Sequence, residues 1–139
     1  ALAANHTISI GSSGLNIAPN VTHAVPGDLL IFRFFPGHHN VASGPFGTPC
    51  QSSATGGGIF SGWVDASDKE QGAAQIFVVE VNDTEPLWLY CSTPHHCSNG
   101  QVAVVNPPSD RSQTLEQYLG AARSTDQSSQ PDGIIGGAL

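Results

Sequence analysis

The chain has 139 residues, a length typical of one domain that buries about two-thirds of its unfolded surface. Charged residues make up only 11% of it, and eleven carboxylates against four Lys and Arg side chains give a formal net charge of −7. The four cations are scattered along the chain, so no basic patch is available to neutralise phosphates and a nucleic-acid partner is excluded.

The content of sixteen Gly and ten Pro favours turns and short strands over long helices. Five runs that alternate or are strongly apolar lie between turn signals and predict strands. They cover residues 6–10, 29–35, 75–81, 87–91 and 101–106. Residues 43–62, rich in Gly, Pro, Ser and Thr, predict a long loop with Phe46, Ile59 and Phe60 as anchors. Together these features predict an all-β sandwich of Greek-key type, with Trp63 and Trp88 in its core.

The pattern changes after Pro107 and Pro108. Apolar residues then recur at helical spacing, which predicts a short amphipathic helix within residues 109–124 that docks on the sandwich. Ser109, Asp110 or Ser112 is available as its N-cap. Residues 125–130 are polar and predict a linker, and the apolar pair at 134–135 either docks or stays free. We therefore divide the chain into a domain over residues 1–108 and a C-terminal extension over residues 109–139.

Glycosylation signals and cysteines indicate the compartment. Sequons begin at Asn5, Asn20 and Asn82, which favours a secreted or cell-surface protein. No run reaches the roughly 18 apolar residues of a membrane span, so we expect a membrane contact only through a C-terminal anchor that has been removed. A chain that begins at Ala1 and lacks Met is expected to be a processed form. In an oxidising compartment two of the three cysteines should pair, and the third needs an explanation.

Cysteine and histidine come together at the end of the fourth predicted strand. Cys91 ends this strand, and the loop that follows contains His95, His96 and Cys97. A soft thiolate and a borderline imidazole on one loop suit copper, with zinc as the competitor. A further imidazole is available from the His38–His39 pair at another strand end. Two His and one Cys make the trigonal set expected of an electron-transfer copper centre.

Such a centre usually adds a weak axial ligand, either Met or Gln. Because the chain has no Met, the axial position falls to Gln, to a backbone carbonyl or to nothing. Gln101 begins the last predicted strand and is placed to turn back toward the metal. A structural zinc module is disfavoured because the Cys-x2-Cys knuckle is missing. His6 and His23 are expected to be ordinary surface or core-edge residues.

The pattern His39-Asn40-Val41, followed by Cys91-x4-His96-Cys97-x3-Gln101, resembles the phytocyanin group of blue copper proteins, above all its stellacyanin branch. With residues 45–50 and 86–91, it also resembles secreted cupredoxin-like proteins of fungi. The resemblance covers residues 6–106 and implies a cupredoxin-like sandwich. It implies His39, Cys91, His96 and Gln101 as ligands of one copper ion, and His38 and His95 as rim residues. It also implies a Cys50–Cys97 disulfide, which leaves Cys91 as the free thiolate.

The leading functional hypothesis is a type 1 (blue) copper protein that carries single electrons, with His96 as the electron port. Two His, a thiolate and a weak axial ligand leave no strong open position for substrate, so we expect no enzyme activity. The clustered His-x-His pairs of multicopper oxidases and an N-terminal His are both missing. The alternative is an extracellular copper-binding or storage protein, or a cell-surface structural protein, without a redox partner. The redox partner is unknown from the sequence, and we expect a monomer.

Overall fold

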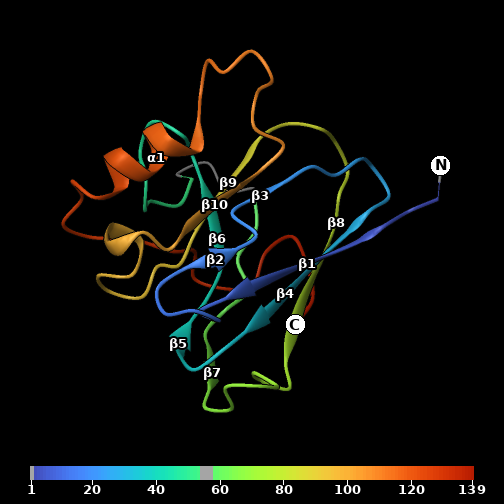
Figure 1. The fold of residues 1–139 in the computed structure, drawn as a ribbon, viewed down its shortest axis with the longest axis vertical. Coiled ribbons are helices and arrows are strands. Elements are labelled where there is room, and N and C mark those ends of the chain that lie inside the picture. Colours follow the sequence, from blue (N-terminus) through green and yellow to red (C-terminus); the bar gives the residue numbers. More distant parts are fainter. Residues whose placement is uncertain (1, 54–57) are drawn as a thin grey trace.

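The computed structural model describes residues 2–53 and 58–139, and Figure 1 shows their arrangement. One four-stranded sheet has the order β2 (Ile17–Ala18), β1 (Asn5–Ile10), β4 (Leu29–Phe34) and β8 (Ile76–Glu80). A second sheet has the order β3 (Val21–Thr22), β10 (Val102–Val105), β9 (Leu87–Tyr90) and β6 (Ala42–Gly44). The strands β5 (Gly37–His39) and β7 (Val64–Ala66) form a separate antiparallel pair. The predicted all-β sandwich is confirmed.

The two sheets share one apolar core because their strands alternate in the expected way. In β4, residues Leu30, Phe32 and Phe34 are buried while their neighbours are only partly buried. β4 lies between β1 and β8, which fits its strongly apolar sequence. Leu89 of β9 and Ala103 of β10 join the same core cluster from the second sheet.

The second sheet is buried on both faces. Every residue of β10 is buried, because one face meets the sandwich core and the other meets a second cluster that includes the C-terminal helix. In that cluster the rings of Trp88 and Tyr118 lie 5.1 Å apart, and Phe46 packs against both. Phe46, Ile59 and Phe60 all serve as anchors, since Ile59 and Phe60 are buried and Phe46 is packed on the cluster.

Five strands have only two or three residues each and were not predicted: β2, β3, β5, β6 and β7. A period of two cannot be recognised over so few positions. One of them, β6, begins just before the predicted loop over residues 43–62 and takes two of its residues from it. Residues 54–57 of that loop lie outside the described residues.

The helix α1 (Leu115–Ala122) is shorter than the predicted segment and begins later. Its N-cap is Thr114, so the prediction of Ser109, Asp110 or Ser112 is wrong. Thr114 forms a capping box: its side chain accepts from the backbone of Gln117, whose side chain accepts from the Thr114 backbone. Tyr118 and Ala122 point into the second cluster, so the helix docks on the sandwich as expected.

The segment after α1 is bound to the sandwich rather than being a free linker. The backbone N–H of Ser129 donates to the Cys50 carbonyl at 3.0 Å, and the Tyr90 hydroxyl donates to the Ser129 carbonyl at 2.7 Å. Further along, Ile135 pairs with Phe60 and Ala138 pairs with Val78 of β8. The linker prediction for residues 125–130 is therefore wrong, and the apolar end docks. The division of the chain after residue 108 stays a prediction.

Within the described ranges, neither helix has the length and apolar character needed to cross a bilayer.

Candidate metal centre

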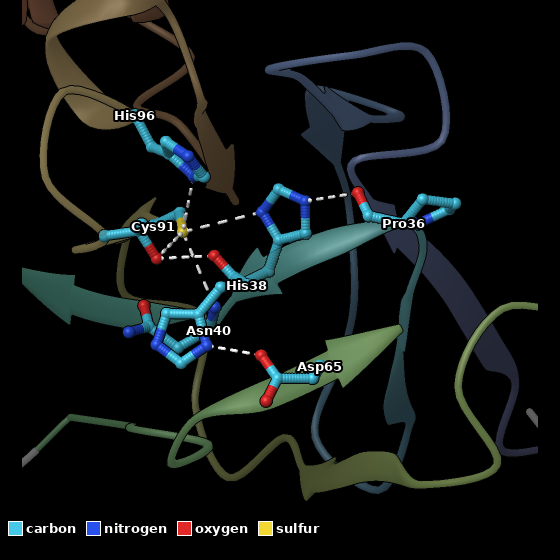
Figure 2. A network of polar contacts seen from close by, with 8 residues as sticks. Pro36, His38, Asn40, Asp65, Cys91 and His96 are labelled. Atoms are coloured by element: carbon cyan, nitrogen blue, oxygen red, sulfur yellow. Dashed lines mark hydrogen bonds and ion pairs between the residues drawn. The ribbon is translucent and has the colours of Figure 1, made fainter. Parts of the chain in front are cut away.

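One end of the sandwich gathers the chemistry-bearing side chains (Figure 2). β9 ends one residue before Cys91, β10 begins one residue after Gln101, and β5 ends at His39. In the described part of the chain, the ligand atoms of His39, Cys91 and His96 lie within 4.8 Å of one another. The Cys91 sulfur is 3.9 Å from Nδ1 of His39 and 3.5 Å from Nδ1 of His96. Two imidazole nitrogens therefore converge on one sulfur.

A close-fitting pocket of backbone fixes the His39 ring. Its Nε2 donates to the Pro36 carbonyl at 3.1 Å, so Nδ1 carries the lone pair that faces Cys91. A Cβ added to Gly11 or Gly37 would lie 2.5 Å or 2.8 Å from Nε2. Both glycines also have positive φ, at +83° and +124°. Only glycine at these two positions allows the backbone to approach the ring this closely.

Cys91 is a fully buried free thiol. Burial raises its pKa, although hydrogen bonds with Thr93 and with the Asn40 backbone oppose the shift. The Asn40 N–H lies 3.5 Å from the sulfur, and the sulfur is 3.4 Å from Oγ1 of Thr93. A buried thiol with its pKa held high becomes a thiolate readily only when a cation is bound beside it.

The Asn40 side chain joins the two ligand-bearing segments. Its Nδ2 donates to Oγ of Ser92 at 2.8 Å, and the Ser92 N–H donates to Oδ1 of Asn40, also at 2.8 Å. All these atoms belong to buried residues. The pair of hydrogen bonds fixes the position of Ser92, the residue after Cys91, relative to the residue after His39.

His96 lies at the start of the 3₁₀ helix η1 (Cys97–Asn99) and is partly buried. Its backbone donates to the Thr93 carbonyl, and its carbonyl accepts from Gln101. Burial lowers the pKa of His96, and the nearby His39 lowers it further. A neutral imidazole is the form that binds a metal ion.

Gln101 is fully buried beside His96. Its Nε2 donates to the Asn16 carbonyl at 3.1 Å, which leaves Oε1 directed at Nδ1 of His96, 3.0 Å away. The amide oxygen, rather than the nitrogen, is thus turned toward the atoms that face the Cys91 sulfur.

The structure places His38 and His95 outside this cluster. His38 is exposed, and its Nδ1 is bonded to the Asp65 carboxylate (Figure 2). Its ring is stacked on that of Trp63. His95 is exposed and has a φ of +71°. The expectation that both tryptophans are core residues holds for Trp88, at 4% exposed, and is wrong for Trp63, at 42%.

A disulfide holds the ligand loop from the outside. Cys50 is bonded to Cys97, the residue after His96, as the resemblance implies. Cys91 is left as the free cysteine, which resolves the odd count. Sequence reasoning had not found the roles of Gly11, Gly37 and Asn40. The two glycines lie just after predicted strands, and nothing in the sequence shows that an imidazole packs on them.

No family model matches the chain. It is 35% identical over 140 residues to a probable GPI-anchored cupredoxin of the fungus Arthroderma benhamiae, an alignment that covers 99% of this chain and 70% of that protein. The chain belongs to the cupredoxin family. Cupredoxins are electron carriers rather than enzymes, in agreement with the expectation that this protein is not an enzyme.

A second relative of this cupredoxin is an extracellular serine-rich protein of the same fungus, 36% identical over 99% of the chain. The chain spans about half of that relative, 53% of its length. Among solved structures, auracyanin A of Chloroflexus aurantiacus matches with a TM-score of 0.50 and 14% identity, covering 73% of this chain and 98% of that one. A reduced auracyanin of Roseiflexus castenholzii matches with a TM-score of 0.50 and 13% identity, covering 76% and 96%. These two likenesses show the shared fold.

Proposed function

We propose that this cupredoxin is a type 1 copper protein that carries single electrons. In this proposal His39, Cys91 and His96 bind the copper ion. The observation that carries the proposal is the convergence of two imidazole nitrogens on a free, buried thiol within 4.8 Å. The donor set fits copper, because a soft thiolate with two borderline imidazoles is the combination found in blue-copper centres.

Gln101 is the fourth ligand in this proposal. The hydrogen bond from its Nε2 to Asn16 supports it, because that bond directs the amide oxygen toward the cluster. An amide oxygen is a harder donor than a thioether sulfur and favours the cupric state. The proposed set is thus two His, one Cys and one Gln, as in the stellacyanin branch that the sequence resembles.

The bound copper would supply a one-electron couple, and the protein's residues would keep the ligands in nearly the same place in both oxidation states. The close packing of Gly11 and Gly37 on His39, the Asn40–Ser92 hydrogen bonds and the disulfide beside His96 all restrict ligand movement. Small rearrangement makes electron exchange fast. His96 is the least buried of the three cluster residues, so its ring edge serves as the electron port.

Copper loading tests the proposal. The wild-type protein with copper(II) should be intensely blue, because the colour reports the copper–thiolate bond. Cys91→Ser should abolish the colour while far-ultraviolet circular dichroism stays unchanged. A matched pair of neighbours adds a control: His39→Gln should lose the colour and His38→Gln should keep it. An undiminished blue spectrum in Cys91→Ser would refute the site.

Electron self-exchange separates the carrier from the storage alternative. Fast exchange between the oxidised and reduced protein, with copper retained against a chelator, supports the carrier. Slow exchange with rapid loss of copper to the chelator supports copper handling instead. Nuclear magnetic resonance line broadening in mixtures of the two oxidation states measures the exchange.

We further propose that the protein acts outside the cell or at its surface. The names of the two fungal relatives described above, a probable GPI-anchored cupredoxin and an extracellular serine-rich protein, support this location. The Cys50–Cys97 disulfide is consistent with an oxidising compartment. The sequon residues Asn5, Asn20 and Asn82 are all exposed and thus accessible to glycosylation. A mass decrease after treatment of the secreted protein with an N-glycosidase tests the three sequons.

A further inference from the structure

Trp63 forms an exposed aromatic stack beside the proposed copper site. Its ring lies parallel to that of His38, with centroids 4.7 Å apart and an interplanar angle of 4°. The Asp65 carboxylate binds Nδ1 of His38 and fixes the orientation of the imidazole (Figure 2). Trp63 is 42% exposed, although a large indole is usually placed in a core.

This stack is connected to Cys91 by a short series of contacts. The Cys91 sulfur lies 3.4 Å from Oγ1 of Thr93, and that hydroxyl donates to the His38 carbonyl at 2.7 Å. His38 is also the residue before His39 in the chain. The indole on the surface is therefore linked to the sulfur through one hydroxyl and one histidine.

The surface around Trp63 has a concave shape and acidic charge. A cleft of about 410 Å³ separates Trp63 from the ligand-loop residues Pro94 and His95 and from the segment of residues 125–128. Among the described residues that line the cleft there is one carboxylate, that of Asp126, and no Lys or Arg. The Asp65 side chain, beside His38, is 80% exposed. Residues 91–101, which form one side of the cleft, contain no carboxylate, so the acidic charge comes from Asp126 and the neighbouring Asp65.

We propose that the Trp63 surface is a second electron-exchange surface, which takes a redox partner with positive charge around its reactive edge. This rests on the proposed copper function. The exposed part of the indole attracts a cation, and the two carboxylates increase the rate of encounter. One electron leaves the reduced copper centre through Thr93, His38 and Trp63 to the partner, which is reduced by one electron. No proton moves.

Oxidation of the reduced, copper-loaded protein by two probes tests this surface. Tris(1,10-phenanthroline)cobalt(III) is cationic and aromatic and becomes cobalt(II), whereas ferricyanide is anionic and becomes ferrocyanide. Trp63→Leu should slow oxidation by the cobalt complex about fivefold, which corresponds to the ~1 kcal/mol of an exposed cation–π contact. Trp63→Phe should keep most of the rate. The rate with ferricyanide, the visible spectrum and the reduction potential should not change in either variant.

A wild-type rate with the cobalt complex in Trp63→Leu, at unchanged colour, would overturn the proposal. An equal slowing with both probes would also overturn it, because the indole would then have only a structural role. If Trp63→Leu fails to fold, fluorescence of the metal-free wild-type protein decides. Trp88 is buried, so saturable quenching by the cobalt complex, but not by iodide, reports binding at Trp63. This measurement needs no copper. Quenching without any blue colour on copper loading would therefore refute the proposed function but not the binding surface.

Discussion

At Gln101 one hydrogen bond determines which amide atom faces the cluster. Because Nε2 is bound to the Asn16 carbonyl, Oε1 is directed at Nδ1 of His96. If the fully buried amide rotated so that its oxygen and nitrogen changed places, both atoms would lose their hydrogen-bond partners. Leaving them unpaired would cost about 1–3 kcal/mol. The position therefore supplies an oxygen donor.

Replacing Gln101 by Met should raise the reduction potential and leave the blue colour largely intact, since a thioether favours copper(II) less than an amide oxygen. Gln101→Leu should raise the potential further, because the oxidised state then has no axial donor from this position. Protein-film voltammetry on wild type and both variants measures the shift. An unchanged potential in both variants would remove Gln101 from the ligand set.

Gly11 packs against the His39 ring, and its N–H donates to the Asn16 carbonyl that also accepts from Gln101. An added Cβ would lie 2.5 Å from the imidazole Nε2, on a backbone with a φ of +83°. We expect Gly11→Ala to push the ring away from Cys91 and to weaken copper binding by about 10–100-fold, as for other groups that orient a metal ligand. Ala at this positive φ should also lower the free energy of unfolding by about 1–2 kcal/mol.

Competition with a chelator measures the loss of copper affinity in Gly11→Ala. Gly14→Ala is the matched control, because Gly14 has a φ of +88° but nothing lies within 4 Å of its added Cβ. The control should lose similar stability and keep wild-type copper affinity. Equal affinities in the two variants would show that Gly11 does not position His39.

At the level of elements, the disulfide joins Cys50, in the segment between β6 and β7, to Cys97 at the start of η1. Cys50 and Cys97 are 47 residues apart in sequence. On the chain-entropy model, closing a loop of that length stabilises the folded state by about 4 kcal/mol. We expect the double variant Cys50→Ser/Cys97→Ser to lose most of this amount in urea unfolding. It should also bind copper less tightly, because His96 precedes Cys97. Unchanged unfolding would contradict the model.

The predictability of the elements follows their length. The strands β1, β4, β8, β9 and β10 have four to six residues and were predicted because apolar periodicity is visible over that length. β5 and β7 were not, although they carry His39 and Asp65, because pairing with a neighbour rather than local sequence makes them strands. For the same reason local sequence did not separate His38 from His39, and the choice of His39 came from the family resemblance. In the structure His38 pairs with Asp65, whereas His39 is buried.

Trp63 shows the same limit in the opposite direction. Its size predicted a core position, yet it is 42% exposed, with its ring stacked on His38 and edge-to-face with Phe60. Cys91, His96 and Gln101 were easier to find, since a single loop and its flanking strand ends carry all three and the chain folds back between neighbouring strands β9 and β10. Local spacing was informative where the site is local, and failed where it depends on β5 and β7.

At the scale of the whole molecule, hydrogen bonds of Asp28 connect the start of β1 to the turn that precedes β4. Its carboxylate accepts from the backbone N–H of Ala4 at 2.9 Å and of Val25 at 3.0 Å, and it pairs with the His6 ring at 2.8 Å. The N-terminal strand is parallel to β4, so no hairpin connects their starts. The Asp28 carboxylate therefore helps to hold the starts of β1 and β4 together.

Asp28 should therefore make the fold sensitive to acid. The hydrogen bond from Ala4, then those from His6 and Val25, lower the pKa of Asp28 from 3.8 to about 2. Because the folded pKa is the lower one, this contribution to stability is fully present above about pH 4–5 and is lost as the pH falls through 3.8 toward 2. Urea unfolding of the metal-free protein should thus show a steep decline in stability over that range.

Asp28→Asn should be less stable at neutral pH and show a shallower decline, whereas the exposed control Asp132→Asn should follow the wild type. If Asp28→Asn declined as steeply as wild type between pH 5 and 2, carboxylates elsewhere would be responsible for the acid sensitivity.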